Sequence, residues 1–300
     1  VAGAFSIHPG EFSKILLLIF IAQLLTQKRA LFTVAGRRFL GMTFPRLRDL
    51  APILVVWAIA ILIMGISNDF GPALILFATV LAMVYFATSR ASWLLIGVGL
   101  VAVGGYAVYQ ISSKIQERVA NFIDPFANFD TIGNQPANAL MALSWGGLTG
   151  TGLGYGHPEL VPVAHSDYIL AAIGEELGLI GVASVLCLFA IFVTCGFQAA
   201  LQVRDTYGKL LAAGLATMIA IQIFVVAGGV STMLPMTGLT TPFMSAGGSS
   251  IMANYILLGL LLRISNLANR PVESDAAAPT LAPGGRRRRA ARAAEEASAR

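Results

Sequence analysis

Charged side chains are scarce in this sequence. Only 12% of its 300 residues are Asp, Glu, Lys or Arg, whereas 56% are hydrophobic and the mean hydropathy is +0.76. Soluble domains carry about 25% charged residues. The shortage of charge therefore excludes a soluble globular domain, and the repeated apolar runs of about 20 residues predict an all-α, polytopic membrane protein.

Cysteine is also scarce, and several ligand motifs are missing. Cys187 and Cys195 lie in one apolar run, about 12 Å apart on a helix, which is too far for a disulfide. No cluster of metal-ligand residues stands out, and no G-K-[ST] phosphate-binding loop occurs. We therefore expect no ATP site, and the sequence identifies no cofactor with certainty. It also has no signal peptide with a basic n-region.

The hydrophobic residues form seven segments. They are 12–27, 51–67, 70–88, 92–110, 168–199, 209–231 and 248–264. The fifth is long enough to tilt or to protrude from the bilayer. Residues 1–264 are thus expected to form a transmembrane domain with one large loop at 111–167, followed by a basic, disordered tail at 265–300.

The basic residues predict the orientation of these segments. All but three of the 20 Lys and Arg residues fall in the same set of loops and in the tail; the exceptions are Lys14, Lys114 and Arg118. The positive-inside rule makes that side cytoplasmic, together with the C-terminus, and puts the 111–167 loop outside. Val1 also falls outside, which is the position expected if further membrane spans come before it. The arginines of the tail suit a membrane surface or a topology anchor rather than nucleic acid.

Two pairs of residues on the outer side suggest ligand binding. Glu11 and Lys14 are three residues apart and share a helix face, and a lysine entering the membrane needs a partner or an anionic ligand. The alternative is an ordinary helix start at Pro9. Lys114 and Arg118 are four apart and suit a phosphate-bearing lipid, although they could also be solvated charges of an amphipathic helix.

Three acids mark the start of the fifth segment. Asp167 lies where the long loop meets the apolar run, and Asp167 or Ser166 could simply cap the helix. Glu175 and Glu176 lie about 12 Å further along. Because they cannot both face lipid cheaply, we expect them to face a polar cavity and to organise it or couple it to a partner.

Glycine and proline mark the remaining outer turns. Asp69 lies in the turn S-N-D-F-G-P, and the glycine-rich stretch 146–156 allows tight turns or close approach to a ligand. Residues 232–247 resemble a re-entrant segment or broken helix that lines a cavity. The residues alone thus predict an outward-facing polar cavity for an anionic amphiphile, which the protein either moves or reacts.

Six motifs occur in an order that resembles one known family. They are H-P-G-E-F-S-K, D-F-G, R-V-A-N-F-I-D-P, G-G-L-T-G-T-G-L-G, H-S-D-Y-I-L-A-A-I-G-E-E-L-G and L-P-M-T-G-L-T-T-P-F-M-S-A-G-G-S-S. Together, from Phe5 to Arg263, they resemble the SEDS family of cell-wall polymerases, which includes RodA, FtsW and SpoVE. The resemblance implies ten spans, of which the first three are absent here, and the last outer loop favours the RodA type.

The resemblance also implies an activity and partners. It implies an inverting peptidoglycan glycosyltransferase that polymerises lipid II at the outer face of the bacterial cytoplasmic membrane, with a class B penicillin-binding transpeptidase as partner. Asp167 would be the general base, and Mg²⁺ or Mn²⁺ could help to neutralise the pyrophosphate. The alternatives are a lipid II flippase and a non-catalytic scaffold. The residues expected to bind substrate are Glu11, Lys14, Lys114, Arg118, His165 and Ser245; those expected to shape the cavity are Asp69, Glu175, Glu176, Gly247 and Gly248.

Overall fold

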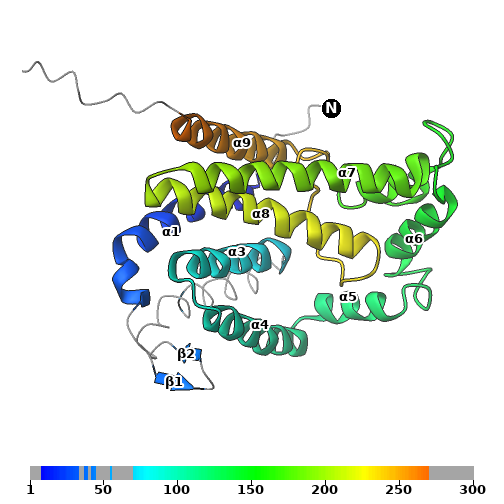
Figure 1. Ribbon diagram of the computed structural model, residues 1–300. Helices are drawn as coiled ribbons and strands as arrows, with labels where there is room; N and C mark the ends of the chain where they lie inside the picture. The colour runs from blue at the N-terminus through cyan, green and yellow to red at the C-terminus, as the bar shows by residue number, and fades with distance from the viewer. Residues whose placement is uncertain (1–7, 34–36, 40–41, 45–54, 56–69, 270–300) are drawn as a thin grey trace, which may run out of the picture. The chain divides into compact units, whose positions relative to one another are not determined.

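A computed structural model describes residues 8–33, 37–39, 42–44, 55 and 70–269 (Figure 1). The helices are α1 (Pro9–Thr33), α3 (Phe70–Thr88), α4 (Ser92–Ile111), α5 (Ser113–Ile123), α6 (Asn134–Gly146), α7 (Ile169–Gln202), α8 (Thr206–Val230) and α9 (Gly248–Ala268), with a short 3₁₀ turn, η1 (Pro158–Leu160). An antiparallel hairpin of β1 (Arg37–Phe39) and β2 (Met42–Phe44) is a minor addition to the predicted helical fold. The all-α prediction is confirmed.

Six of the described helices are long and apolar enough to cross a membrane: α1, α3, α4, α7, α8 and α9. They coincide with six of the seven predicted segments. The remaining predicted segment, 51–67, lies outside the described residues apart from Val55, and Asp69 lies outside them too. The chain is therefore a multi-pass membrane protein.

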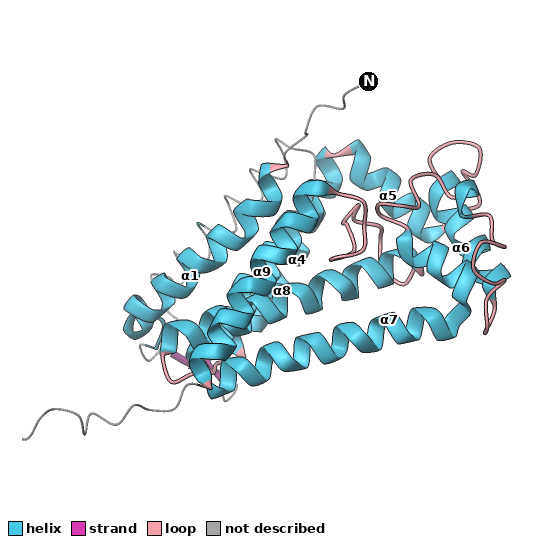
Figure 2. Cartoon of the chain, turned by 90° about the horizontal axis from the view of Figure 1, so that it is seen from above, coloured by secondary structure: helices cyan, strands magenta, loops and turns pink. Residues whose placement is uncertain are grey.

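Helix α8 is the centre of the bundle. It packs against α1, α3, α7 and α9, and most of its length is buried (Figures 1 and 2). Its contact with α7 is close because Gly196 faces Ala216: a Cβ on Gly196 would lie 2.9 Å from that of Ala216. Small residues of this kind let membrane helices approach each other and gain van der Waals contact.

The predicted 111–167 loop is largely ordered and partly helical. Helix α5 follows α4 directly, and α6 packs along α7 through its small residues. Residues 147–157, here called the glycine loop, connect α6 to η1. Within the predicted segment 168–199, α7 is kinked at Gly178, where φ is +68°. These elements stand beside the end of α8 that leads into the α8–α9 loop (residues 231–247).

The tail forms a separate unit. The compact unit of the bundle runs from Val1 to Ala268, and a second unit runs from Asn269 to Arg300. Helix α9 thus continues four residues beyond the predicted boundary at residue 264. The predicted disordered tail lies outside the described residues, except for its first residues up to Asn269.

Candidate functional site

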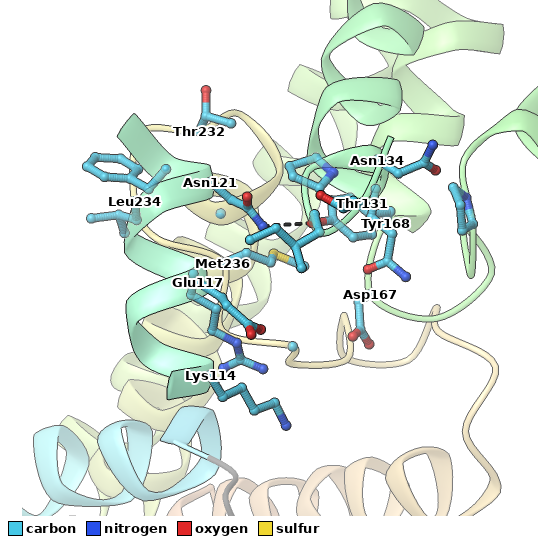
Figure 3. Close-up of a pocket in the computed structure, with 18 of the residues that line it drawn as sticks. Lys114, Glu117, Asn121, Thr131, Asn134, Asp167, Tyr168, Thr232, Leu234 and Met236 are labelled. Carbon is cyan, nitrogen blue, oxygen red and sulfur yellow. Dashed lines mark hydrogen bonds between the residues drawn. The ribbon is translucent and has the colours of Figure 1, made fainter. Parts of the chain in front are cut away.

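A cavity of about 590 Å³ opens where the predicted outer segments meet. Helix α5, residues 130–136, the residues before α7, the last turn of α8 and the α8–α9 loop form its walls (Figure 3). Its charged and titratable lining residues are Lys114, Glu117, Arg118, Asp130, Asp167 and Tyr168. The cavity thus gathers two predicted cations and the predicted base from segments that are far apart in the sequence.

Asp167 lies on the wall opposite α5 (Figure 3). Its side chain is half-buried, and its Oδ1 accepts a hydrogen bond of 2.8 Å from the Ser166 hydroxyl. The second carboxylate oxygen lies on the side of Gly238 in the α8–α9 loop. One oxygen is therefore held by a neighbouring hydroxyl, while the other faces the loop that borders the cavity.

The α8–α9 loop holds the segment before α7 in place. The Ser245 hydroxyl donates to the carbonyl of Ser166 at 2.5 Å and accepts the backbone N–H of Thr241 at 2.7 Å. The N–H of Ala246 donates to the carbonyl of His165 at 2.8 Å. Ser245 is completely buried. These contacts set the position of the backbone that carries Asp167.

Arg118 and Lys114 come from consecutive turns of α5, which places both on the cavity side (Figure 3 labels Lys114). Arg118 Nη1 donates to the carbonyl of Thr237 at 2.9 Å. A Cβ at Gly238 would lie 3.0 Å from Arg118 Nη2 and 3.6 Å from Asp167 Oδ2. Gly238, with φ +70°, therefore lets the loop pass between the guanidinium and the carboxylate.

Tyr168 is a lining residue that the sequence did not single out. Burial raises the pKa of its hydroxyl, the negative charge of Asp167 raises it further, and Arg118 opposes the shift. Tyr168 therefore stays neutral at physiological pH. Its neutral hydroxyl lies in the cavity wall next to Asp167, and no local pattern in the sequence predicts that position.

Glu11 and Lys14 form the predicted pair, but they do not line this cavity. Lys14 Nζ lies 2.9 Å from Glu11 Oε2, and only 4% of the lysine side chain is exposed. Within the described residues Lys14 Nζ has no hydrogen-bond acceptor of good geometry. The N–H of His8 donates to Ser249 Oγ at 3.0 Å, which attaches the start of α1 to α9.

Glu175 and Glu176 contact the glycine loop. Glu175 Oε1 accepts the N–H of His157 at 2.8 Å, and Glu176 Oε1 accepts that of Gly154 at 3.2 Å. Neither lines the cavity. Both carboxylates instead bind the backbone of the glycine loop, and a polar cavity around them stays a prediction.

The other predicted residues lie around this centre. His165 is exposed, and Gly247 and Gly248 join the α8–α9 loop to α9. Among the described residues no three His, Cys, Asp or Glu side chains lie close enough to hold a metal ion between them. Three carboxylates, Glu117, Asp130 and Asp167, nevertheless line the cavity, and Mg²⁺ commonly binds one or two carboxylates plus substrate phosphates.

Comparisons with known proteins agree with this architecture. A profile of the FtsW/RodA/SpoVE family, described as cell cycle protein, matches residues 1–270. A protein named peptidoglycan glycosyltransferase RodA from Mycobacterium leprae is 51% identical over 270 residues, which are 90% of this chain and 58% of the relative. Stage V sporulation protein E of Bacillus subtilis is 33% identical over 88% of this chain and 69% of its own. The chain thus spans little more than half the length of the mycobacterial relative.

A solved structure shares the fold. One chain of a structure described as "Structural coordination of polymerization and crosslinking by a peptidoglycan synthase complex" superposes with a TM-score of 0.63 at 24% identity, covering 89% of this chain and 85% of its own. At that identity the likeness supports the fold alone. It agrees with the all-α arrangement derived from the hydropathy pattern.

Proposed function

The chain belongs to the FtsW/RodA/SpoVE family, and from this premise we propose that it is a peptidoglycan glycosyltransferase that polymerises lipid II. The geometry that supports the proposal most directly is the cavity in which Asp167 lies opposite Lys114 and Arg118. A carboxylate suits proton removal from a sugar hydroxyl, and two cations suit a pyrophosphate leaving group.

The chemistry follows from the charge that develops during transfer. The 4-hydroxyl of the acceptor sugar attacks the anomeric carbon of the donor, the bond to the pyrophosphate breaks, and Asp167 accepts the hydroxyl proton. An α-linked donor becomes a β-1,4 glycan, so the reaction inverts configuration and needs one base without a covalent intermediate. Lys114 and Arg118 lie where they would stabilise the negative charge that grows on the pyrophosphate. Mg²⁺ or Mn²⁺, if bound with the substrate, would supply further positive charge there.

The orientation and the partner belong to the same proposal. Arg204 follows the end of α7, and Arg263 lies near the end of α9, so both are at the bundle end far from the cavity. The positive-inside rule then puts the C-terminus in the cytoplasm and the cavity at the outer face of the bacterial cytoplasmic membrane. A class B penicillin-binding transpeptidase is the partner that would cross-link the strands.

The test is polymerisation of lipid II by the protein in detergent, together with its transpeptidase. Detergent removes the two sides of a membrane, so a flippase would give no polymer. We expect glycan strands from the wild type and a loss of at least about 100-fold in Asp167→Asn, because a general base contributes about 10² to 10⁴. Gel analysis of labelled glycan strands measures the polymer made by the wild type and by Asp167→Asn.

The matched control is Glu159→Gln, an exposed carboxylate of the same outer segment that does not line the cavity. Its activity should match that of the wild type. Full activity of Asp167→Asn would refute Asp167 as the base. Absence of polymer from the wild type with its transpeptidase would refute the glycosyltransferase and favour the flippase or the scaffold.

A further inference from the structure

Large apolar side chains stand exposed around the glycine loop. Trp145, at the end of α6, is 58% exposed, and within the loop Leu148 is 69%, Leu153 72% and Tyr155 81% exposed. They belong to one short stretch of chain and are not among the residues that line the cavity. Four large apolar side chains exposed within so short a stretch are costly in water and indicate a contact with a partner or a membrane.

The same stretch carries no charge. No Asp, Glu, Lys or Arg occurs from Thr131 to Pro158, although charged residues lie just before it, at Asp124 and Asp130, and just after it, at Glu159. A soluble domain has about a quarter of its residues charged. The absence of charge favours a lipid surface over a polar protein surface as the occupant.

Backbone hydrogen bonds hold the glycine loop at one level along α7. The N–H of Thr151 donates to the carbonyl of Glu175 at 2.9 Å, and the N–H of Leu179 donates to the carbonyl of Gly147 at 2.9 Å. The kink at Gly178 frees these α7 groups from the helical ladder. The loop is therefore attached to the helix beside the kink and is not free to move along it.

That level corresponds to the edge of the bilayer. From Gln202 to Gly178 α7 is about 36 Å long, slightly more than the hydrocarbon thickness of about 30 Å. Leu179 and Ile180 are exposed beside the loop, and Leu188 and Ile191 continue the exposed apolar surface along the span. Trp and Tyr are enriched at membrane–water interfaces because one part of each ring system is apolar and the other polar.

We propose that the glycine loop and the end of α6 form an interfacial anchor, in which Trp145, Leu148, Leu153 and Tyr155 insert into the headgroup–acyl boundary on the cavity side of the membrane. Glu175 and Glu176 bind the backbone of the same loop, so the anchor fixes the height of the kinked part of α7 relative to the lipid. The anchor is independent of the proposed catalysis and would hold for a transporter or a scaffold as well.

Spin-label accessibility tests the anchor. Cys187 and Cys195 are both exposed, so Cys187→Ala with Cys195→Ala provides a cysteine-free background at little cost. Nitroxide labels are then placed at Leu153→Cys, Glu159→Cys and Leu188→Cys, and the protein is reconstituted in phosphatidylglycerol–phosphatidylethanolamine bilayers. Power saturation measures collision with oxygen, which concentrates in lipid, and with a polar nickel chelate, which stays in water.

We expect the label at position 153 to lie between the other two in depth, with more oxygen contact than position 159 and less than position 188. Two results would overturn the proposal: a position-153 label as accessible to nickel as position 159, which means water, or one shielded from both reagents, which means a protein cover. A second measurement needs no cysteine replacement: quenching by lipids brominated near the headgroup should be smaller in Trp145→Phe than in the wild type. Equal quenching would also contradict the anchor.

Discussion

At the scale of single residues, Asp167 depends on two serine hydroxyls. Ser166 donates to its carboxylate, and Ser245 binds the carbonyl of Ser166 from the α8–α9 loop. Ser245 was predicted as a substrate ligand, and the structure shows its hydroxyl donating to the protein backbone in a fully buried position. Its most direct contribution is thus the position of Asp167.

We predict that Ser245→Ala lowers polymerisation by about 10-fold or more. The substitution leaves the Ser166 carbonyl and the Thr241 N–H without their buried partner, which costs about 1–3 kcal/mol. A loss that falls on kcat with KM unchanged would identify a positioning role. Ser231→Ala is the control, because the Ser231 hydroxyl bonds only to carbonyls of its own helix.

If Ser245→Ala were as active as the wild type, Ser245 would not position Asp167. If its KM rose with kcat unchanged, the original prediction of a substrate contact would gain support instead. Thermal unfolding of both variants in detergent separates these effects from a general loss of folded protein.

At the scale of elements, α7 and the glycine loop act as one unit. Gly178 has φ +68°, and Gly150 and Gly152 have φ +82° and +103°. A Cβ on Gly178 would overlap the backbone of Gly150 and Leu148. The glycines are therefore needed for backbone-to-backbone contact at the kink, which accounts for glycine at these positions of the loop.

We predict that Gly178→Ala destabilises the protein by at least about 2 kcal/mol. The left-handed backbone alone costs a non-glycine residue about 1–2 kcal/mol, and the overlap adds to it. Hydrogen exchange should speed up at the amides of Thr151 and Leu179, which donate to the carbonyls of Glu175 and Gly147 beside the kink. Gly259→Ala in α9, where a Cβ meets nothing within 4 Å, should leave both stability and exchange unchanged. Unchanged exchange in Gly178→Ala would refute the coupling.

At the scale of the whole molecule, the central position of α8 determines how the cavity is built. The helices around α8 lead into the segments that wall the cavity, and the α8–α9 loop contacts several of them. A Cβ on Gly71 at the start of α3 would lie 2.9 Å from the carbonyl of Thr237, and Thr240 Oγ1 lies 2.8 Å from Ser250 Oγ in α9. The bundle and the site therefore share one set of contacts.

We predict that Gly196→Val destabilises the bundle by about 1–3 kcal/mol. Its Cβ would press on Ala216, whose own Cβ cannot move unless α7 and α8 separate, and overpacking of a tight contact costs this amount. Thermal unfolding in detergent measures the loss. Gly99→Val in α4, with open space around the new Cβ, is the matched control and should unfold like the wild type. Equal stability of the two variants would show that the α7–α8 contact is loose.

The sequence by itself determined that this is a multi-pass membrane protein, where the six described spans lie and which family the chain belongs to. Hydropathy suffices for the spans because a bilayer demands apolar runs of a set length, whatever the neighbouring helices are. The ordered motifs suffice for the family. The charges of Lys114, Arg118 and Asp167 also stood out by themselves, since they occur in outer segments of a chain that has few charges.

Only the tertiary structure decided which of these residues meet. Lys114, Arg118 and Asp167 share a cavity, whereas Glu11 and Lys14 pair elsewhere, and Glu175 and Glu176 bind the glycine loop. The kink at Gly178, the neutral Tyr168 and the buried Ser245 were equally invisible beforehand. The physical reason is that long-range contacts depend on backbone dihedrals and burial, which a hydropathy pattern with a period of one helix turn does not encode.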